Sequence, residues 1–196
     1  MNRRRLVFTP VALAFAAGLA ACSDQNKPAE AAAKAPAAKP SASEAYDLAK
    51  QGSGFTIGAM MAANTVYVFF DPACPHCAQL WMSAKPLLSK LKMVWMPIGL
   101  LGKSSLAQGA TILAAPDPVA AMDQNEISVI ERKGGITAST NLGEDVQGKV
   151  KANTELFHKL GAESVPFLVF RNAKNGTFGQ HAGAVPTDQL AAMVGV

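Results

Sequence analysis

The chain has 196 residues, 49% of them hydrophobic, which suits one domain with a sizeable core plus an appendage. Its formal charge of +4 includes Arg3, Arg4 and Arg5, and without this N-terminal cluster the charge falls to about +1. Neither the charge nor any basic cluster elsewhere in the chain points to nucleic-acid binding.

The N-terminus has the layout of a secretory signal peptide. A charged start, residues 1–5, precedes the apolar run 6–18, which is too short for a comfortable bilayer span. The Leu-Ala-Ala-Cys sequence that ends at Cys22 resembles the bacterial lipobox, in which the cysteine becomes the lipidated first residue of the mature protein. We therefore expect a lipoprotein signal peptide over residues 1–21 and lipidation of Cys22. The alternative is an ordinary cleaved signal with a free Cys22 nearby.

Residues 22–43 are rich in Ala, Lys and Pro and contain no large apolar side chain. Such a segment cannot bury enough surface to offset the entropy lost on ordering, so it predicts a lipid-anchored flexible linker. The linker would hold a folded domain, residues 44–196, in the periplasm at the inner or the outer membrane. Ser23, rather than Asp, after the cysteine favours the outer membrane by analogy with enteric bacteria.

The folded domain is predicted to mix strands and helices. Predicted strands cover 54–57, 65–70, 92–98, 167–170 and 177–181, and predicted helices cover 45–51, 75–91, 104–114, 117–132, 144–160 and 186–194. Pro86 is expected to kink the helix that contains it. A strand that follows a strand–helix unit indicates parallel pairing, so the class is α/β, with a block of helices inserted over residues 104–160. This block either forms a substrate groove or covers the sheet.

The chemistry of the chain is concentrated in Cys74-Pro75-His76-Cys77, which opens the helix after the central strand. Unpaired N–H groups and the helix dipole favour an anion there, so Cys74 is the candidate nucleophile and Cys77, one turn further, the resolving thiol. His76 adds a donor or a positive charge, and Pro75 stiffens the turn. A structural disulfide or half a metal site is the alternative, but the other two histidines do not complete a four-ligand zinc site.

The stretches 66–81, 108–118 and 160–170 resemble the thioredoxin-fold catalytic domain of periplasmic Dsb proteins, of the DsbG/DsbC type. The resemblance covers most of residues 65–196 and implies a thioredoxin fold with a helical insertion and disulfide exchange with exported proteins. Two features depart from that type. The Ala/Lys/Pro linker takes the place of the separate N-terminal dimerisation domain of those proteins. The Cys-Pro-His-Cys tetrapeptide, and Val165 before Pro166, resemble the corresponding residues of DsbA instead.

The resemblance also implies roles for residues distant from the cysteines. Pro166 would be the cis-proline that faces the dithiol, with the backbone of Val165 exposed for pairing with an extended substrate. The alternative is a trans proline at a strand start. Thioredoxin and DsbA place a buried acid six residues before the first cysteine, where this chain has Val68, so the resolving thiol is expected to lack that proton acceptor. Asp71 is expected to turn the chain before the dithiol.

The direction of electron flow stays open. Likeness to DsbG and DsbC favours an isomerase or reductase served by a DsbD-like membrane reductant, whereas the tetrapeptide favours a monomeric DsbA-like oxidase served by a DsbB-like oxidant. A non-catalytic copper or zinc protein that uses the tetrapeptide is the alternative of another class. Met60, Met61, Met93 and Met96 would suit copper, but their apolar neighbours favour core packing. We expect a monomer without cofactor or bound metal.

Overall fold

The computed structural model describes residues 39–62 and 65–196. The predicted signal peptide, the lipidation site Cys22 and most of the predicted linker lie outside the described residues. The chain divides into two units, 1–37 and 38–196, and the second carries the elements described below. Within the described ranges, no helix is both long enough and apolar enough to cross a membrane.

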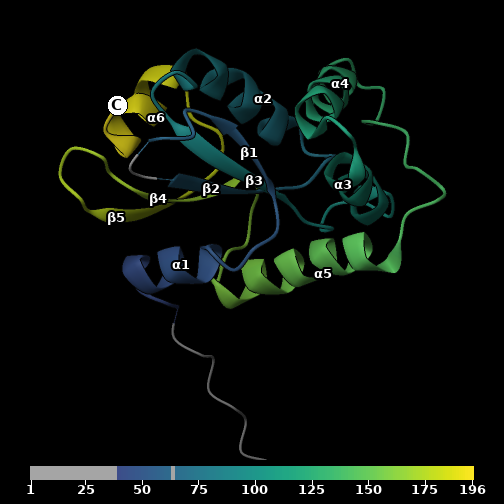
Figure 1. The fold of residues 1–196 in the computed structure, drawn as a ribbon, viewed down its shortest axis with the longest axis horizontal. Coiled ribbons are helices and arrows are strands. Elements are labelled where there is room, and N and C mark those ends of the chain that lie inside the picture. The colour runs from purple at the N-terminus through teal and green to yellow at the C-terminus, as the bar shows by residue number, and fades with distance from the viewer. Residues whose placement is uncertain (1–38, 63–64) are drawn as a thin grey trace, which may run out of the picture. The chain divides into compact units, whose positions relative to one another are not determined.

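A five-stranded sheet with helices on both faces forms the domain (Figure 1). The strands are β1 (Phe55–Gly58), β2 (Thr65–Phe70), β3 (Lys92–Pro97), β4 (Phe167–Arg171) and β5 (Phe178–Ala182). The helices are α1 (Ala42–Ala49), α2 (Pro75–Ala84), η1 (Lys85–Leu87), α3 (Ser105–Ala114), α4 (Pro118–Ile130), α5 (Glu144–Lys159) and α6 (Thr187–Val194). The strand order is β1-β3-β2-β4-β5, with β2 and β3 parallel and the other pairs antiparallel. The predicted α/β class and the parallel central pair are confirmed.

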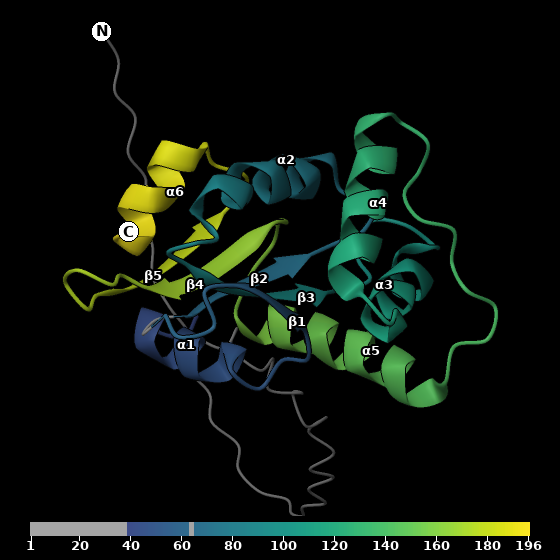
Figure 2. The same ribbon diagram turned by 45° about the horizontal axis from the view of Figure 1, so that its top comes forward.

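The helices form two layers around the sheet. Helices α1 and α5 lie on one face, and α2 and α6 lie on the other (Figure 2). The inserted helix α3 contacts α5 and β3, while α4 contacts α2 and β1. The insertion therefore joins the two layers at one end of the sheet and places α4 beside the helix that carries the cysteines.

The two largest differences between the predicted and the observed helix boundaries have causes in local chemistry. Helix α1 begins at Ala42 rather than residue 45, because Ser41 caps it: the hydroxyl accepts from the Glu44 backbone N–H, and the Glu44 carboxylate accepts from the Ser41 N–H. Helix α2 ends at Ala84 instead of bending at Pro86, because proline has no N–H for the helical ladder, and a 3₁₀ turn follows.

The core-packing prediction for the methionines is half right. Met93 and Met96 lie on β3 and are fully buried. Met60 and Met61 are 63% and 96% exposed, because they follow the end of β1 in a surface connection rather than in a strand.

Aromatic side chains lock α2 onto the sheet. The Trp81 ring packs edge-on against Trp95, with centroids 5.0 Å apart, and lies 6.2 Å from Phe55. Phe70, the last residue of β2, lies 5.6 Å from Trp95. These contacts fix the direction in which α2 leaves β2, and therefore the position of the cysteines between them.

The buried side chain of Asn153 joins α5 to β3 and to the segment that precedes β1. Its side-chain amide donates to the carbonyls of Ser53 and Pro97 at 2.7 and 3.0 Å, and its carbonyl accepts from the Ser53 N–H at 2.8 Å. Asn153→Ala leaves these groups without partners, so we expect it to lower the free energy of unfolding by about 2–3 kcal/mol. Urea unfolding measures this. Asn141→Ala, at an exposed loop position, is the control and should stay within about 0.5 kcal/mol of wild type. Equal stability of the two variants would contradict this role of Asn153.

Candidate active site

The tetrapeptide lies at the junction of β2 and α2. Cys74 is the N-cap of α2, with extended backbone angles of φ −90° and ψ 115°, and Pro75 is the first helical residue. The Cys74 carbonyl accepts from the Cys77 N–H at 3.0 Å, which closes the first turn. Proline suits this first position because the missing N–H would have no partner within the helix. The predicted helix-opening geometry is confirmed.

The two thiols are free and differ in acidity far more than in exposure. Cys74 is 3% exposed and Cys77 fully buried, so the expected contrast in accessibility is small. A hydrogen bond from the Cys77 thiol is the main cause that lowers the pKa of Cys74 to about 7; burial opposes it, and the backbone N–H groups of Cys77 and His76 assist. Burial, together with the hydrogen bond and charge of Cys74, raises the pKa of Cys77 well above its ordinary value. This asymmetry gives one thiolate and one protonated partner at neutral pH.

His76 is exposed, and its Nδ1 lies 3.0 Å from Oε1 of Gln79. Because a carboxamide oxygen only accepts, Nδ1 carries the proton in this contact. The charge of His76 lowers the pKa of Cys74 less than the hydrogen bonds from Cys77 and the helix backbone do. The thiolate is therefore stabilised mainly by Cys77 and the helix backbone.

The acidity of Cys74 gives a testable pH profile. Thiolate reactivity should rise with pH to a plateau with a midpoint near 7. At pH 6 such a thiol is about 100-fold more ionised than one of pKa 9, and lower nucleophilicity of the thiolate cancels about tenfold, so the net gain is about tenfold. Iodoacetamide labelling, assigned to Cys74 by peptide fragmentation, measures this. Cys77 should remain unlabelled below pH 9. A Cys74 midpoint near 9 would contradict the arrangement.

The later proline faces the dithiol. The Val165–Pro166 peptide bond is cis, as predicted. The Cys74 sulfur lies 3.6 Å from the Val165 carbonyl oxygen, a contact between residues far apart in the sequence. The structure thus brings together all six residues predicted for the site within the described part of the chain: Cys74, Pro75, His76, Cys77, Val165 and Pro166.

Asp71 turns the chain before the dithiol, as predicted, and does more. This fully buried carboxylate accepts from the Ala73 N–H at 2.9 Å, which makes the turn. It also accepts from the Ser105 hydroxyl at 2.7 Å and from the N–H groups of Leu100 and Leu101 at 2.7 and 2.8 Å. One side chain therefore ties the active-site loop to the segment after β3 and to α3.

Helix α4 contributes a second tie to the active-site loop, which sequence reasoning missed. The Asn125 side-chain amide donates to the Pro72 carbonyl at 2.9 Å, and its carbonyl accepts from the Ile136 N–H at 2.8 Å. A Cβ at Gly135 would meet the Asn125 oxygen at 2.8 Å, and the Gly135 φ of +86° also favours glycine. Polar residues on the buried face of a predicted helix were the available signal.

The neighbouring Glu126 is also buried, at 1% exposure. One oxygen, Oε1, accepts from the Asn125 amide at 3.2 Å, and Oε2 has no hydrogen-bond partner among the described residues. Burial above all raises the pKa of Glu126 to about 8; the Asn125 hydrogen bond opposes this, and the charges of Cys74 and Asp71 add to it. An ionisable carboxyl therefore lies within electrostatic range of the dithiol, although Val68 occupies the position where thioredoxin and DsbA carry a buried acid.

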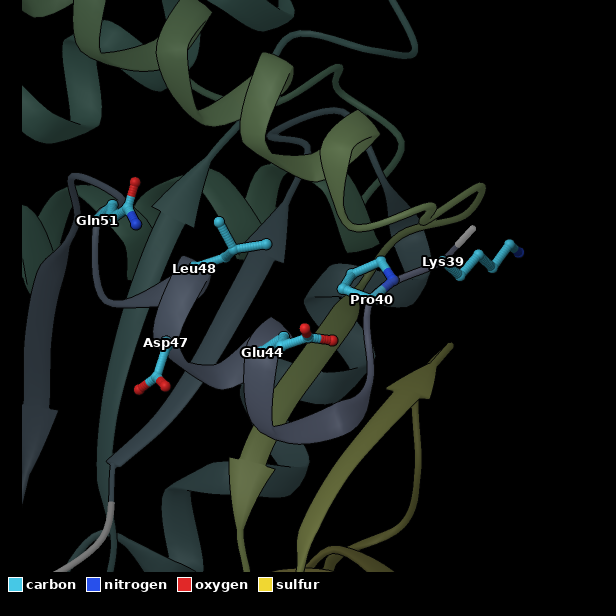
Figure 3. A pocket seen from close by; sticks show the side chains of 6 residues that line it. All are labelled: Lys39, Pro40, Glu44, Asp47, Leu48 and Gln51. Carbon is cyan, nitrogen blue, oxygen red and sulfur yellow. The ribbon is translucent and has the colours of Figure 1, made fainter. Parts of the chain in front are cut away.

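Two surface hollows differ in their relation to this site. A pocket of about 600 Å³ between α2 and α4 begins at Pro75 and is lined by Gln79, Met82 and Ile130 among others. A second, of about 560 Å³, is formed around α1 by Lys39, Pro40, Glu44, Asp47, Leu48 and Gln51 (Figure 3). Because α1 and α2 cover opposite faces of the sheet, only the first adjoins the cysteines. No cluster of three or more His, Cys, Asp or Glu suited to a metal occurs in residues 39–62 and 65–196.

The fold and its dithiol define a class of protein, and comparison with known families agrees. The model of the thioredoxin-like domain matches residues 61–195, so the chain belongs to the thioredoxin-like domain family. The predicted thioredoxin fold with a helical insertion is thereby confirmed.

Curated relatives include two thiol:disulfide interchange proteins DsbG. The chain is 30% identical to that of Pseudomonas aeruginosa over 162 residues, which cover 80% of this chain and 60% of the relative. It is 30% identical to that of Escherichia coli over 138 residues, which cover 69% and 55%. The chain thus spans little more than half the length of these relatives.

Similar solved structures share the fold. The catalytic domain of Proteus mirabilis ScsC has a TM-score of 0.58 at 22% identity, with 78% of this chain and 93% of that chain covered. A periplasmic thioredoxin-like protein from Salmonella enterica has a TM-score of 0.59 at 22% identity, with 80% and 97% covered.

Proposed function

We propose that the protein is a thiol–disulfide oxidoreductase of the bacterial cell envelope that exchanges disulfides with cysteines of exported proteins. The observation that carries this proposal is the pair of free thiols at the start of α2, one with a pKa of about 7 and the other held protonated. A structural disulfide needs no such difference. Exchange does, because only the thiolate attacks a disulfide.

The exchange follows from this geometry in two steps. The Cys74 thiolate attacks a substrate disulfide, forms a mixed disulfide and releases one substrate sulfur as a thiolate. Cys77 then loses its proton and attacks the Cys74 sulfur, so that the Cys74–Cys77 disulfide forms and the second substrate sulfur leaves. The cysteine pair is oxidised and the substrate disulfide reduced. The reverse sequence donates a disulfide.

The acidity of Cys74 supports the DsbG-like direction, reduction or isomerisation, over the DsbA-like oxidase alternative. A pKa of about 7 resembles thioredoxin's value of about 7 rather than the value of about 3.5 in DsbA. Weaker stabilisation of the thiolate makes the disulfide less oxidising. The acidity of Cys74 thus favours the DsbG-like direction, although the tetrapeptide is Cys-Pro-His-Cys. The two DsbG relatives support the same direction.

Unfolded or partly folded polypeptides are the proposed substrates. Met82 and Ile130 are 47% and 53% exposed beside the pocket that begins at Pro75, which gives an apolar surface next to Cys74. Val165, whose carbonyl lies at the thiol, is the proposed main-chain partner of an extended substrate, with Pro166 holding it there.

A periplasmic location and membrane partners complete the proposal. The DsbG and periplasmic thioredoxin-like relatives support the periplasm, and the proposed redox partner is a DsbD-like membrane reductant. The lipobox-like sequence supports lipidation of Cys22 and an inner- or outer-membrane anchor for a monomeric domain behind the linker of residues 22–43. Cys22→Ser should then move the protein from the membrane fraction to the soluble periplasmic fraction, and an unchanged distribution would contradict the anchor.

Assays of insulin reduction and of scrambled ribonuclease refolding test the activity. We expect reduction with dithiothreitol as electron source, and recovery of active ribonuclease from scrambled disulfides. Rapid oxidation of reduced ribonuclease without isomerisation would support the oxidase alternative. Tight stoichiometric binding of copper or zinc with neither activity would contradict an enzyme.

A further inference from the structure

The contacts of the buried Glu126 carboxylate show no role for it in stabilising the fold. Among the described residues, Asn125 supplies its one hydrogen bond, a long contact of 3.2 Å from the amide nitrogen that also donates to the Pro72 carbonyl at 2.9 Å. The other oxygen is buried without a partner among the described residues. A buried carboxyl oxygen without a hydrogen-bond partner lowers stability, which suggests that Glu126 is kept for a functional reason.

The position of Glu126 relative to the dithiol is fixed from two sides. Asn125, the preceding residue, bonds the carbonyl of Pro72 in the loop that carries the cysteines. One turn earlier, Asp123 accepts from the Trp81 indole N–H at 2.6 Å and pairs with Lys85 at 2.6 Å, which ties α4 to α2. The carboxylate is within electrostatic range of both Cys74 and Cys77.

The second exchange step needs a proton acceptor at this place. Cys77 is fully buried, and its pKa is raised well above the ordinary value, so hydroxide in bulk water reaches the thiol poorly at neutral pH. Val68, at the position where thioredoxin and DsbA carry a buried acid, has no acid–base chemistry. Some other group has to take the proton before Cys77 can attack.

We propose that the Glu126 carboxylate accepts the Cys77 proton, directly or across one water, when Cys77 resolves the mixed disulfide. This inference rests on the proposed function. In the step, the proton moves from the Cys77 sulfur to Glu126, the Cys77 electron pair forms the bond to the Cys74 sulfur, and the bond from Cys74 to the substrate breaks. The substrate leaves as a thiolate, and Glu126 returns the proton to it or to solvent. In the opposite direction, protonated Glu126 supplies the proton to Cys77.

The charged groups around Glu126 set when it can act. Cys74 and Cys77 at the start of α2, and Asp71 in the loop after β2, interact with it electrostatically. The Asp123–Lys85 pair lies one turn away along α4. A Cys74 thiolate raises the pKa of Glu126, and formation of the mixed disulfide removes that charge. Glu126 therefore becomes a carboxylate more readily at the stage when Cys77 must lose its proton.

The two steps can be timed separately with an aromatic disulfide, dithiobis(nitrobenzoate), as the substrate. Attack by Cys74 releases one coloured thiolate at a rate proportional to reagent concentration, and resolution by Cys77 releases a second at a rate independent of it. We expect Glu126→Gln to slow resolution about 100-fold or more at pH 7, the range of general-base catalysis, and to leave attack within about threefold. Its resolution rate should then rise tenfold per pH unit across pH 6–9, whereas the wild-type rate levels off once Glu126 is ionised.

Control variants separate this role from others. Glu131→Gln removes an exposed carboxylate that pairs with Lys133 at the end of the same helix and should change neither step. Glu126→Asp should keep the levelling-off of the resolution rate. Faster resolution in Glu126→Gln would mean that the charge of the carboxylate only opposes ionisation of Cys77. Equal slowing of attack and resolution would mean that Glu126 has a structural role. Either result overturns the inference. Absence of a second release in the wild type would refute the proposed function itself.

Discussion

Replacing Cys74 with serine is expected to reduce insulin reduction to the uncatalysed background. A serine hydroxyl forms no mixed disulfide, and Cys77 cannot take over because its raised pKa keeps it protonated at neutral pH. The loss should be accompanied by nearly unchanged thermal stability, since serine is close to cysteine in size and its hydroxyl can keep the polar contacts of the Cys74 sulfur with Cys77 and with the Val165 carbonyl. A Cys74→Ser variant that retained substantial activity would contradict the assignment of the nucleophile.

Cys77→Ser is the matched variant, and it should fail at a different stage. Cys74 still attacks, but the mixed disulfide has no internal thiol to resolve it, so protein-linked substrate should accumulate. Non-reducing gels of envelope extracts would show these adducts, and dithiothreitol would cleave them by reducing the mixed disulfide. Wild-type turnover by Cys77→Ser, or adducts formed equally by Cys74→Ser, would contradict the assigned order of attack.

The largest expected effect on stability comes from Asp71→Asn. The buried carboxylate accepts four hydrogen bonds. In asparagine an NH₂ group replaces one of the two oxygens, and this group cannot accept from the donors that surround it. We expect the free energy of unfolding to fall by about 2–4 kcal/mol, because buried donors to a charged acceptor lose their partner. In a domain of this size the melting temperature should drop by roughly 10 °C.

Asp117→Asn makes the same chemical change where it should not matter. Asp117 is exposed and caps α4, accepting from the N–H groups of Val119 and Ala120 at 3.0 Å, and asparagine caps helices about as well as aspartate. Thermal melts of the two variants compare them directly. An Asp71→Asn protein as stable as Asp117→Asn would show that the Asp71 network is not needed to hold the active-site loop.

The fold was largely predictable because its signals are local. Apolar runs such as Thr65–Phe70 predict strands, and Asp117 followed by Pro118 predicts a helix start; both elements form as predicted. Errors arose where a short-range interaction competed with a longer pattern. Ser41 extends α1 into the segment predicted as linker, and Pro86 ends α2 early.

The site was predictable only in part. Cys74 and Cys77 are one helical turn apart, so their spacing already defines their relation. The approach of Val165 to Cys74 depends on tertiary structure, and only resemblance to a family indicated it. An inserted helix brings Glu126 within electrostatic range of the dithiol, and neither spacing nor the usual position of the buried acid indicated it.

The redox equilibrium of the protein with glutathione tests the central claim most directly. The oxidised fraction of Cys74 and Cys77 is measured by mass-tagging of thiols, with Trp81, buried one turn beyond Cys77, as a fluorescence reporter. We expect a reversible two-electron transition at a potential clearly more reducing than the value of about −120 mV for DsbA, toward the thioredoxin value of about −270 mV. A potential near that of DsbA would favour a disulfide donor, or a dithiol that is kept reduced only by a dedicated membrane partner. No reversible transition at any glutathione ratio would contradict disulfide exchange by this dithiol.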